Sequence, residues 1–124
     1  MIHETVDTHC HINFFKNPGD IALACEKYRV HTIYVTTLPS QFEATYDYVK
    51  ALTYIHPAIG FHALESNYDL EAERNIFLRN IDKTQYVGEI GLDFSKRSTV
   101  DQCFQIENFE FILNSLISNI SGLT

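Results

Sequence analysis

Short segments rich in apolar and β-branched residues alternate with segments of helical spacing along the chain. The strand-like segments lie at residues 5–9, 31–37, 57–62 and 85–91. The helical segments follow them, with starts expected near Pro18, near Ser40, at Ser66 or Asn67, and near Thr99. Such alternation is typical of a parallel sheet whose strands are joined by crossover helices. The sequence therefore predicts an α/β fold with four βα units in chain order.

Residues suited to helix starts stand at two of these boundaries. Asn17 can cap a helix in which Pro18 occupies the first turn and Asp20 favours the positive end of the helix dipole. Ser40 and Glu43 have the spacing of a capping box. These signals predict helices that begin soon after the first and second strands.

The length of 124 residues predicts one small domain, residues 1–124, and its composition is acidic. A net charge of −7 argues against broad electrostatic binding of nucleic acid, but not against a grip on phosphate through bound metal ions. No run of 18 apolar residues indicates a membrane span, and the N-terminus lacks the basic and apolar regions of a signal peptide. The three scattered cysteines predict core thiols in a reducing, cytoplasmic environment.

The triplet His9-Cys10-His11 at the end of the first strand is the sharpest chemical feature. Side chains at i and i+2 of a strand point the same way, so the two imidazoles project together and Cys10 is turned away. Two imidazoles on one face can hold a divalent ion. A triplet of this kind also arises by chance, but proteins of βα repeats place their ligands at the carboxyl ends of strands. The position therefore favours a metal site.

A second feature is the carboxylate of Glu89 inside an otherwise apolar strand. A buried charge is costly unless it is paired or bound to a metal. Asp93 shares the parity of Glu89, so both can face the same side. The alternative is a salt bridge from Glu89 to Lys96 or Arg97. Combined with the histidine pair, Glu89 is the expected third metal ligand.

His62 ends the third strand and is expected at the same rim as the other ligands. It contacts substrate phosphate or acts as an outer-shell donor; the alternative is a surface histidine. The remaining histidines, His3, His31 and His56, are interpreted as surface or strand-entry residues.

These residues resemble the TatD family of metal-dependent deoxyribonucleases, which lies within the amidohydrolase-like metal hydrolases. The matching segments are Val6-Asp7-Thr8-His9-Cys10-His11, Gly60-Phe61-His62 and Gly88-Glu89-Ile90-Gly91-Leu92-Asp93, with a weaker match at Gln105, Phe109 and Leu113. The resemblance extends over about residues 2–114. Residues 16–18 and 35–39 also resemble a short TatD branch associated with the Qat type of anti-phage defence.

The resemblance implies a (β/α)8 TIM barrel with two divalent ions, Mg²⁺, Mn²⁺ or Zn²⁺, and DNA as the substrate. His9 and His11 would bind the first ion, Glu89 would bridge both, and His62 would contact the substrate. The family usually has proline after the histidine that matches His62, where this chain has Ala63. The family also takes two further histidines and a late aspartate from later strands.

A (β/α)8 barrel needs about 250 residues, and four βα units are half of one. We therefore expect a truncated domain that lacks its C-terminal half or, alternatively, a natural half barrel that closes as a homodimer. With one partial ligand set, the isolated chain is expected to be a weak or inactive nuclease. Two rival functions remain: a catalytically dead scaffold or binding protein in a defence or repair complex, and an amidohydrolase-like enzyme on another substrate.

Overall fold

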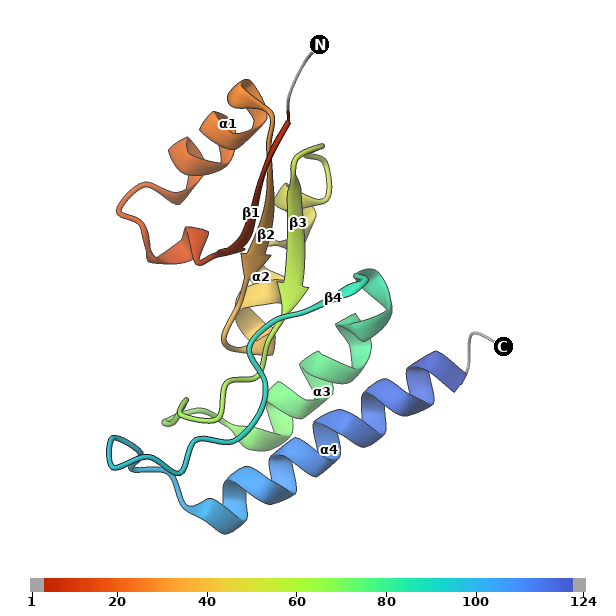
Figure 1. The fold of residues 1–124 in the computed structure, drawn as a ribbon. Coiled ribbons are helices and arrows are strands. Elements are labelled where there is room, and N and C mark those ends of the chain that lie inside the picture. The colour runs from red at the N-terminus through yellow and green to blue at the C-terminus, as the bar shows by residue number, and fades with distance from the viewer. Residues whose placement is uncertain (1–3, 122–124) are drawn as a thin grey trace.

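The computed structural model describes residues 4–121, and these form one parallel sheet with strand order β1-β2-β3-β4 (Figure 1). The strands are β1 (Thr5–Cys10), β2 (Val30–Val35), β3 (Ile55–Ile59) and β4 (Tyr86–Val87). The helices are α1 (Pro18–Tyr28), α2 (Pro39–Val49), α3 (Leu70–Asn80) and α4 (Gln102–Ser121), with 3-10 turns η1 (Ile12–Phe14) and η2 (Ile81–Lys83). The predicted four βα units are confirmed, and together they make half of a (β/α)8 barrel.

The core lies between the sheet and its helices. Tyr34 of β2 and Ile55 of β3 are buried against Ala22 of α1 and Val49 of α2. A second cluster joins the end of β3 to the later helices through Phe42, Ile59, Phe61, Phe77, Ile81 and Ile112. On the opposite face, Val6 of β1 leaves 60% of its surface exposed. In a complete barrel this inner face would be covered by four further strands.

The helix starts agree with the sequence only in part. Proline occupies the first turn of α1 as predicted, but the Asn17 side chain makes no capping hydrogen bond. The expected capping box is wrong, because Leu38 precedes α2 and the Glu43 carboxylate instead binds Arg79 at 2.6 Å. The third helix begins after Asp69, whose side chain accepts from the Ala72 N–H, rather than at Ser66 or Asn67.

The fourth helix also starts later than the expected Thr99. Asp101 precedes it and accepts a hydrogen bond on Oδ1 from the Phe104 N–H at 3.0 Å. Cys10 and Cys25 pack against the core as predicted, whereas Cys103 in this helix is exposed. The first turn of α4 is therefore capped by Asp101, and Cys103 in this turn faces solvent.

The fourth strand is much shorter than the predicted segment 85–91. Only Tyr86 and Val87 pair regularly with β3. Gly91 has a φ of 135°, a conformation that L-residues with a side chain rarely adopt. The backbone therefore leaves the extended path before Asp93, which changes where that side chain points.

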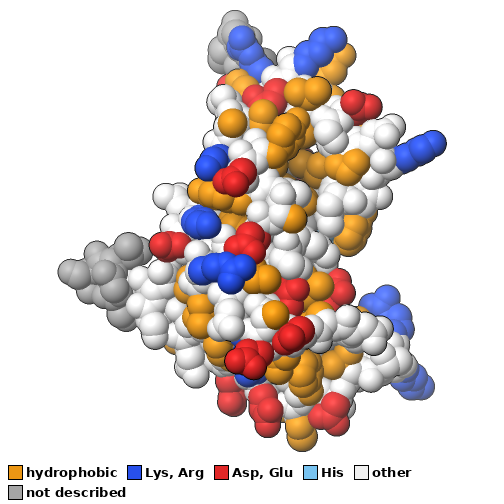
Figure 2. Space-filling view, turned by 180° about the vertical axis from the view of Figure 1, so that it is seen from behind, with side chains coloured by type: hydrophobic (Ala, Val, Ile, Leu, Met, Phe, Trp, Pro, Cys, Tyr) orange, Lys and Arg blue, Asp and Glu red, His pale blue; other side chains and the backbone are white. Residues whose placement is uncertain are grey.

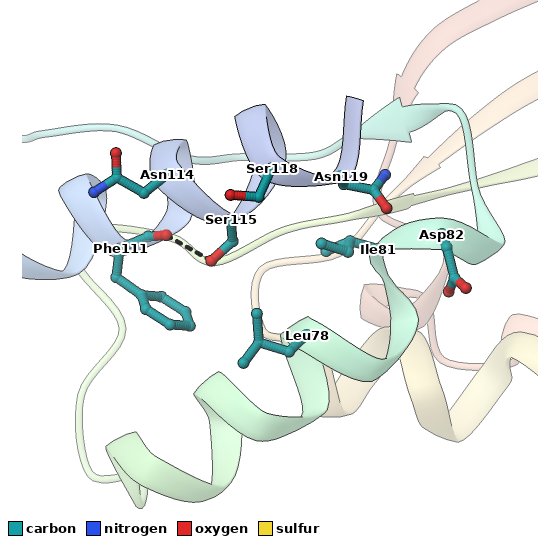
Figure 3. Close-up of a pocket in the computed structure, with 8 residues that line it drawn as sticks. All are labelled: Leu78, Ile81, Asp82, Phe111, Asn114, Ser115, Ser118 and Asn119. Atoms are coloured by element: carbon teal, nitrogen blue, oxygen red, sulfur yellow. Dashed lines mark hydrogen bonds between the residues drawn. The ribbon is translucent and has the colours of Figure 1, made fainter. Parts of the chain in front are cut away.

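Helix α4 lies beside α3, and the two share a partly polar contact (Figure 1). The Arg74 Nε donates to Asn108 Oδ1 over 3.1 Å, and the guanidinium stacks 4.7 Å from the centre of the Phe111 ring. A groove of about 520 Å³ lies between the two helices. Figure 3 shows its lining residues, among them Ser115, whose hydroxyl donates to the Phe111 carbonyl one turn earlier in α4. Asp82 is the one acidic side chain that lines it. This groove therefore carries no cluster of metal-ligating side chains.

Candidate metal centre

The end of β1 contains a bulge that decides which way its histidines point. Asp7 pairs with Thr32 of β2 and Cys10 pairs with Tyr34, so β1 has one residue more than β2 between these pairs. Such a bulge reverses the alternation of side chains and re-aims the residues that follow. The Asp7 Oδ1 accepts a hydrogen bond from the backbone N–H of His9 at 3.0 Å. Asp7 thus stabilises the bulge from its own side chain.

The rings of His9 and His11 converge, as their i, i+2 spacing predicts. Their Nε2 atoms are 3.1 Å apart, and the rings meet edge to face. The His11 Nδ1 lies 2.9 Å from the Val35 carbonyl oxygen at the end of β2. Because a carbonyl only accepts, this contact assigns the proton to Nδ1 and leaves the Nε2 lone pair free for an ion.

Glu89 lies two residues beyond the end of β4, and two glycines, Gly60 and Gly88, allow its backbone to come close. A Cβ on Gly60 would stand 1.7 Å from the Thr36 carbonyl oxygen, and one on Gly88 would stand 2.9 Å from the same atom. The Phe61 N–H donates to the Glu89 carbonyl at 2.9 Å, which continues the ladder beyond the last strand residue. The close approach of these backbones carries the carboxylate to the ends of β1 and β2.

The three side chains fit one divalent ion. The His9 Nε2 lies 3.5 Å from Glu89 Oε1, and the His11 Nε2 lies 3.8 Å from Glu89 Oε2. Ligand atoms at about 2.0–2.2 Å from a tetrahedral ion are separated by roughly 3.3–3.6 Å. Within residues 4–121 this is the one group of three such side chains whose ligand atoms all lie within 4.8 Å of one another. Two imidazoles and a carboxylate suit Zn²⁺ and Mn²⁺ among other ions.

His62 stands beside this group without joining it. Its Nδ1 accepts a hydrogen bond from the Leu64 N–H at 3.0 Å, which assigns the ring proton of the neutral form to Nε2. That Nε2 lies 3.8 Å from Glu89 Oε2. A nitrogen that carries a proton donates rather than ligates, so this geometry suits the predicted contact with a substrate phosphate.

Asp93 lies at the rim of the same hollow but does not converge on the histidines. The two carboxylates of Glu89 and Asp93 and the His62 ring line a hollow of about 260 Å³. Asp93 Oδ1 accepts from the Ser95 N–H at 2.9 Å. Hydrogen bonds from the Ser95 side chain and then from its backbone N–H lower the pKa of Asp93. Arg97 approaches Asp93 to 4.0 Å. The alternative pairing of Glu89 with Arg97 is therefore wrong, because Asp93 takes that partner.

Two residues that position the site were not predicted from the local sequence pattern. Asp7 holds the bulge, and Gln105 holds the loop after Glu89. Gln105 is 2% exposed, and its side chain accepts from the Asp93 N–H at 2.8 Å and donates to the Asp93 carbonyl at 2.9 Å. Only the resemblance pointed to Gln105, because nothing in its local spacing predicts a contact twelve residues back.

The histidines interpreted as surface residues form a second polar group in the described part of the chain. The His31 Nδ1 lies 3.0 Å from His56 Nε2, and the His31 Nε2 lies 2.8 Å from Glu4 Oε2. Hydrogen bonds from His31 and Tyr54 lower the pKa of Glu4. These contacts run in a line and do not converge on one point. His3 lies outside the described residues.

A half barrel with imidazoles and a carboxylate at the carboxyl ends of its strands defines a class of protein, the βα-barrel proteins with a metal centre at that end. Residues 6–115 match the family model described as TatD related DNase, so the chain belongs to this family, which is generally dependent on divalent metals.

The chain is also similar to a solved structure, the crystal structure of YJJV, a TatD homolog from Escherichia coli K12. The TM-score is 0.65 at 21% sequence identity, and the match covers 92% of this chain and 45% of that chain. This likeness supports the fold, and the chain spans less than half the length of that relative. The comparison with curated proteins gives no match. In the part of the chain described by the structure, no helix has the length and hydropathy needed to cross a membrane.

Proposed function

We propose that this chain provides the first metal-binding half of a TatD-type nuclease that hydrolyses phosphodiester bonds in DNA. The observation that carries the proposal is the convergence of His9, His11 and Glu89 at the strand ends. A bound Mg²⁺, Mn²⁺ or Zn²⁺ ion would supply an activated water and neutralise charge that develops on the phosphate.

The residues of the chain itself prepare the place where a phosphate would bind. His11 is oriented by the Val35 carbonyl, and the Nε2–H of His62 faces the hollow beside Glu89 as a donor for a phosphate oxygen. Acidic side chains gather over the lower half of the face drawn in Figure 2, where α3 and α4 lie. A DNA backbone is repelled there, so a phosphate bound at the rim of the sheet would depend on the charge of a metal ion.

We propose further that one ion binds and that the isolated chain cleaves DNA weakly or not at all. Three side chains are enough to hold one ion, whereas the two-ion chemistry of the family needs further ligands. Those ligands would come from the other half of a barrel, supplied by additional chain or by a second copy. The cytoplasm is the proposed location, supported by three free cysteines in the structure. The anti-phage assignment stays a prediction.

Titration of the purified chain with Mn²⁺, followed by calorimetry, tests the metal site. We expect about one ion per chain, loss of binding in His11→Ala, and retained binding in the control His56→Ala. Incubation with Mn²⁺ and labelled single-stranded DNA then tests activity. Robust cleavage that disappears in His9→Ala would overturn the expected weak activity.

The open inner face of the sheet favours one alternative, a binding or scaffold protein without catalysis. Val6 on this face and the edge strands β1 and β4 remain accessible to another polypeptide. Absence of any Mn²⁺ or Zn²⁺ binding in the titration would contradict the nuclease proposal and leave this alternative.

A further inference from the structure

Exposed aromatic side chains follow both of the strands that bring the candidate metal ligands together. Phe14 ends η1 and Phe15 comes directly after it, and they leave 63% and 49% of their surface exposed. Phe94 lies in the loop after Glu89 and is 47% exposed. Large rings held open beside a metal centre mark a surface on which another molecule can lie.

These rings differ in position from the surface that the second half of a barrel would cover. Both segments are loops that leave the carboxyl ends of β1 and β4. In a closed barrel such loops form the mouth at which ligands bind, whereas the faces of the strands are packed inside. Further strands would therefore cover Val6 on the inner face of β1 but would leave Phe14 and Phe94 at the mouth.

Phe14 is held against one of the candidate metal ligands. Its ring is stacked on that of His11, with 4.8 Å between the ring centres and 22° between the ring planes. His11 is itself oriented by the Val35 carbonyl at 2.9 Å. One face of the Phe14 ring therefore covers His11, and the large exposed fraction of Phe14 leaves the other face open to solvent. A ring fixed on one side and open on the other is a platform for a planar group.

Basic side chains accompany the rings in both loops, although the chain as a whole has a net charge of −7. Lys16 follows Phe15, while Lys96 and Arg97 come soon after Phe94, and all three basic residues are exposed. Segments 14–16 and 94–97 contain no acidic residue. Rings interleaved with positive charge are typical of surfaces that bind unpaired nucleic acid, where bases stack on the rings and the charges follow the phosphates.

We propose that Phe14 is a base-binding residue, on whose open face the base next to the metal-bound phosphate stacks. This inference rests on the proposed nuclease function and deepens it, because the base is the planar part of the same nucleotide and lies one sugar away from its phosphate. A base inside a duplex is already stacked on its neighbours, so the nucleotide at Phe14 is unpaired. The contact tolerates any sequence, since every base has an aromatic face.

Fluorescence anisotropy with two labelled strands tests this site in the Mn²⁺-loaded chain. One strand is a short oligothymidylate, and the other is an abasic strand of the same length, which has the same phosphates but no bases. We expect the oligothymidylate to bind about five- to tenfold more tightly, the lower part of the range for one stacked base. Titration with Mn²⁺ alone reports the proposed metal site independently of either strand.

Three variants separate base stacking from the packing of Phe14 on His11. Phe14→Leu keeps an apolar side chain against His11 but has no aromatic face, so the preference for oligothymidylate falls toward one while Mn²⁺ affinity is retained. Phe14→Tyr keeps the ring and is expected to keep the preference. Tyr28→Leu is the control, because Tyr28 is 69% exposed but ends α1, just before the start of β2 at the other end of the sheet; the preference should not change.

Equal binding of the two strands to the unmodified chain would overturn the proposal, as would a preference that persists in Phe14→Leu. A loss of Mn²⁺ affinity in Phe14→Leu as large as its loss of DNA affinity also contradicts it, because Phe14 would then act only through His11. If the unmodified chain binds no Mn²⁺, the proposed function fails together with this inference. If the chain binds Mn²⁺ but does not discriminate between the strands, only the role of Phe14 is wrong.

Discussion

Replacing Gly60 by alanine tests whether close backbone contact assembles the carboxyl end of the sheet. A Cβ at this position would stand 1.7 Å from the Thr36 carbonyl oxygen. A carbon and a carbonyl oxygen in contact are separated by about 3.3 Å. Because the atom in the way is backbone, the ends of β2 and β3 must move apart by roughly 1.5 Å to accept the methyl group.

The cost of this movement follows from the contacts that it breaks. Overpacking of a tight site costs about 1–3 kcal/mol. The Gly60 N–H donates to Thr36 Oγ1 at 3.0 Å, and that hydroxyl donates to the Ala58 carbonyl at 2.8 Å. Each of these hydrogen bonds contributes about 0.5–1.5 kcal/mol. We therefore expect Gly60→Ala to lower the free energy of unfolding by about 2–6 kcal/mol, a large part of the stability of a small domain.

Urea denaturation followed by far-UV circular dichroism measures this loss, since the chain has no tryptophan. Gly19→Ala is the matched control, because a Cβ on Gly19 in α1 meets nothing within 4 Å. That change is expected to be neutral or to stabilise by about 0.4–1 kcal/mol. A Gly60→Ala variant whose free energy of unfolding lies within about 1 kcal/mol of that of the unmodified chain would refute the reasoning. That difference corresponds to a change of about fivefold in the ratio of folded to unfolded protein.

Three further outcomes follow from individual contacts. Asp7→Ala should weaken Mn²⁺ binding about two- to tenfold, because the bulge loses its hydrogen bond; Asp7→Asn keeps an acceptor and should bind almost as well in the same titration. Hydrogen bonds from Arg79 and Asn80 lower the pKa of Glu43 to about 2 from 4.5, so the stabilisation is complete above pH 4.5 and is lost as the pH falls toward 2. Arg79→Met should flatten this part of an acid-unfolding curve, and an unchanged curve would contradict the ion pair. Gln105→Leu should speed amide hydrogen exchange in residues 93–100, measured by mass spectrometry, and equal exchange would argue against its positioning role.

The order of strands and helices could be predicted from the sequence because burial leaves a periodic pattern in the chain. The helix starts were less predictable, since a cap depends on partners in space. Glu43 has the local spacing of a capping residue, yet Arg79, 36 residues away, takes its carboxylate. An ion pair of this kind leaves no mark on the spacing around Ser40.

The short fourth strand has a similar origin. Residues 85–91 contain the apolar and β-branched side chains of a strand, but only two of them pair regularly. The φ of 135° at Gly91 turns the backbone, and Asp93 then reaches Ser95 and Arg97 instead of continuing the alternation from Glu89. A parity rule holds only while the chain stays extended. Asp93 still lines the same hollow as Glu89, but its carboxylate is held by Ser95 and Arg97 and does not join the histidines.

The histidine pair shows what the i, i+2 rule for strands predicts and what it leaves open. The i, i+2 spacing predicts that His9 and His11 share a direction, and the rings do meet. The spacing does not predict which face they share, since the register between Asp7 and Cys10 shifts against β2. In a regular strand His9 would follow the parity of Asp7, whose partner Thr32 is buried on the helical side. The bulge therefore converts a pair of neighbouring imidazoles into a pair that faces Glu89.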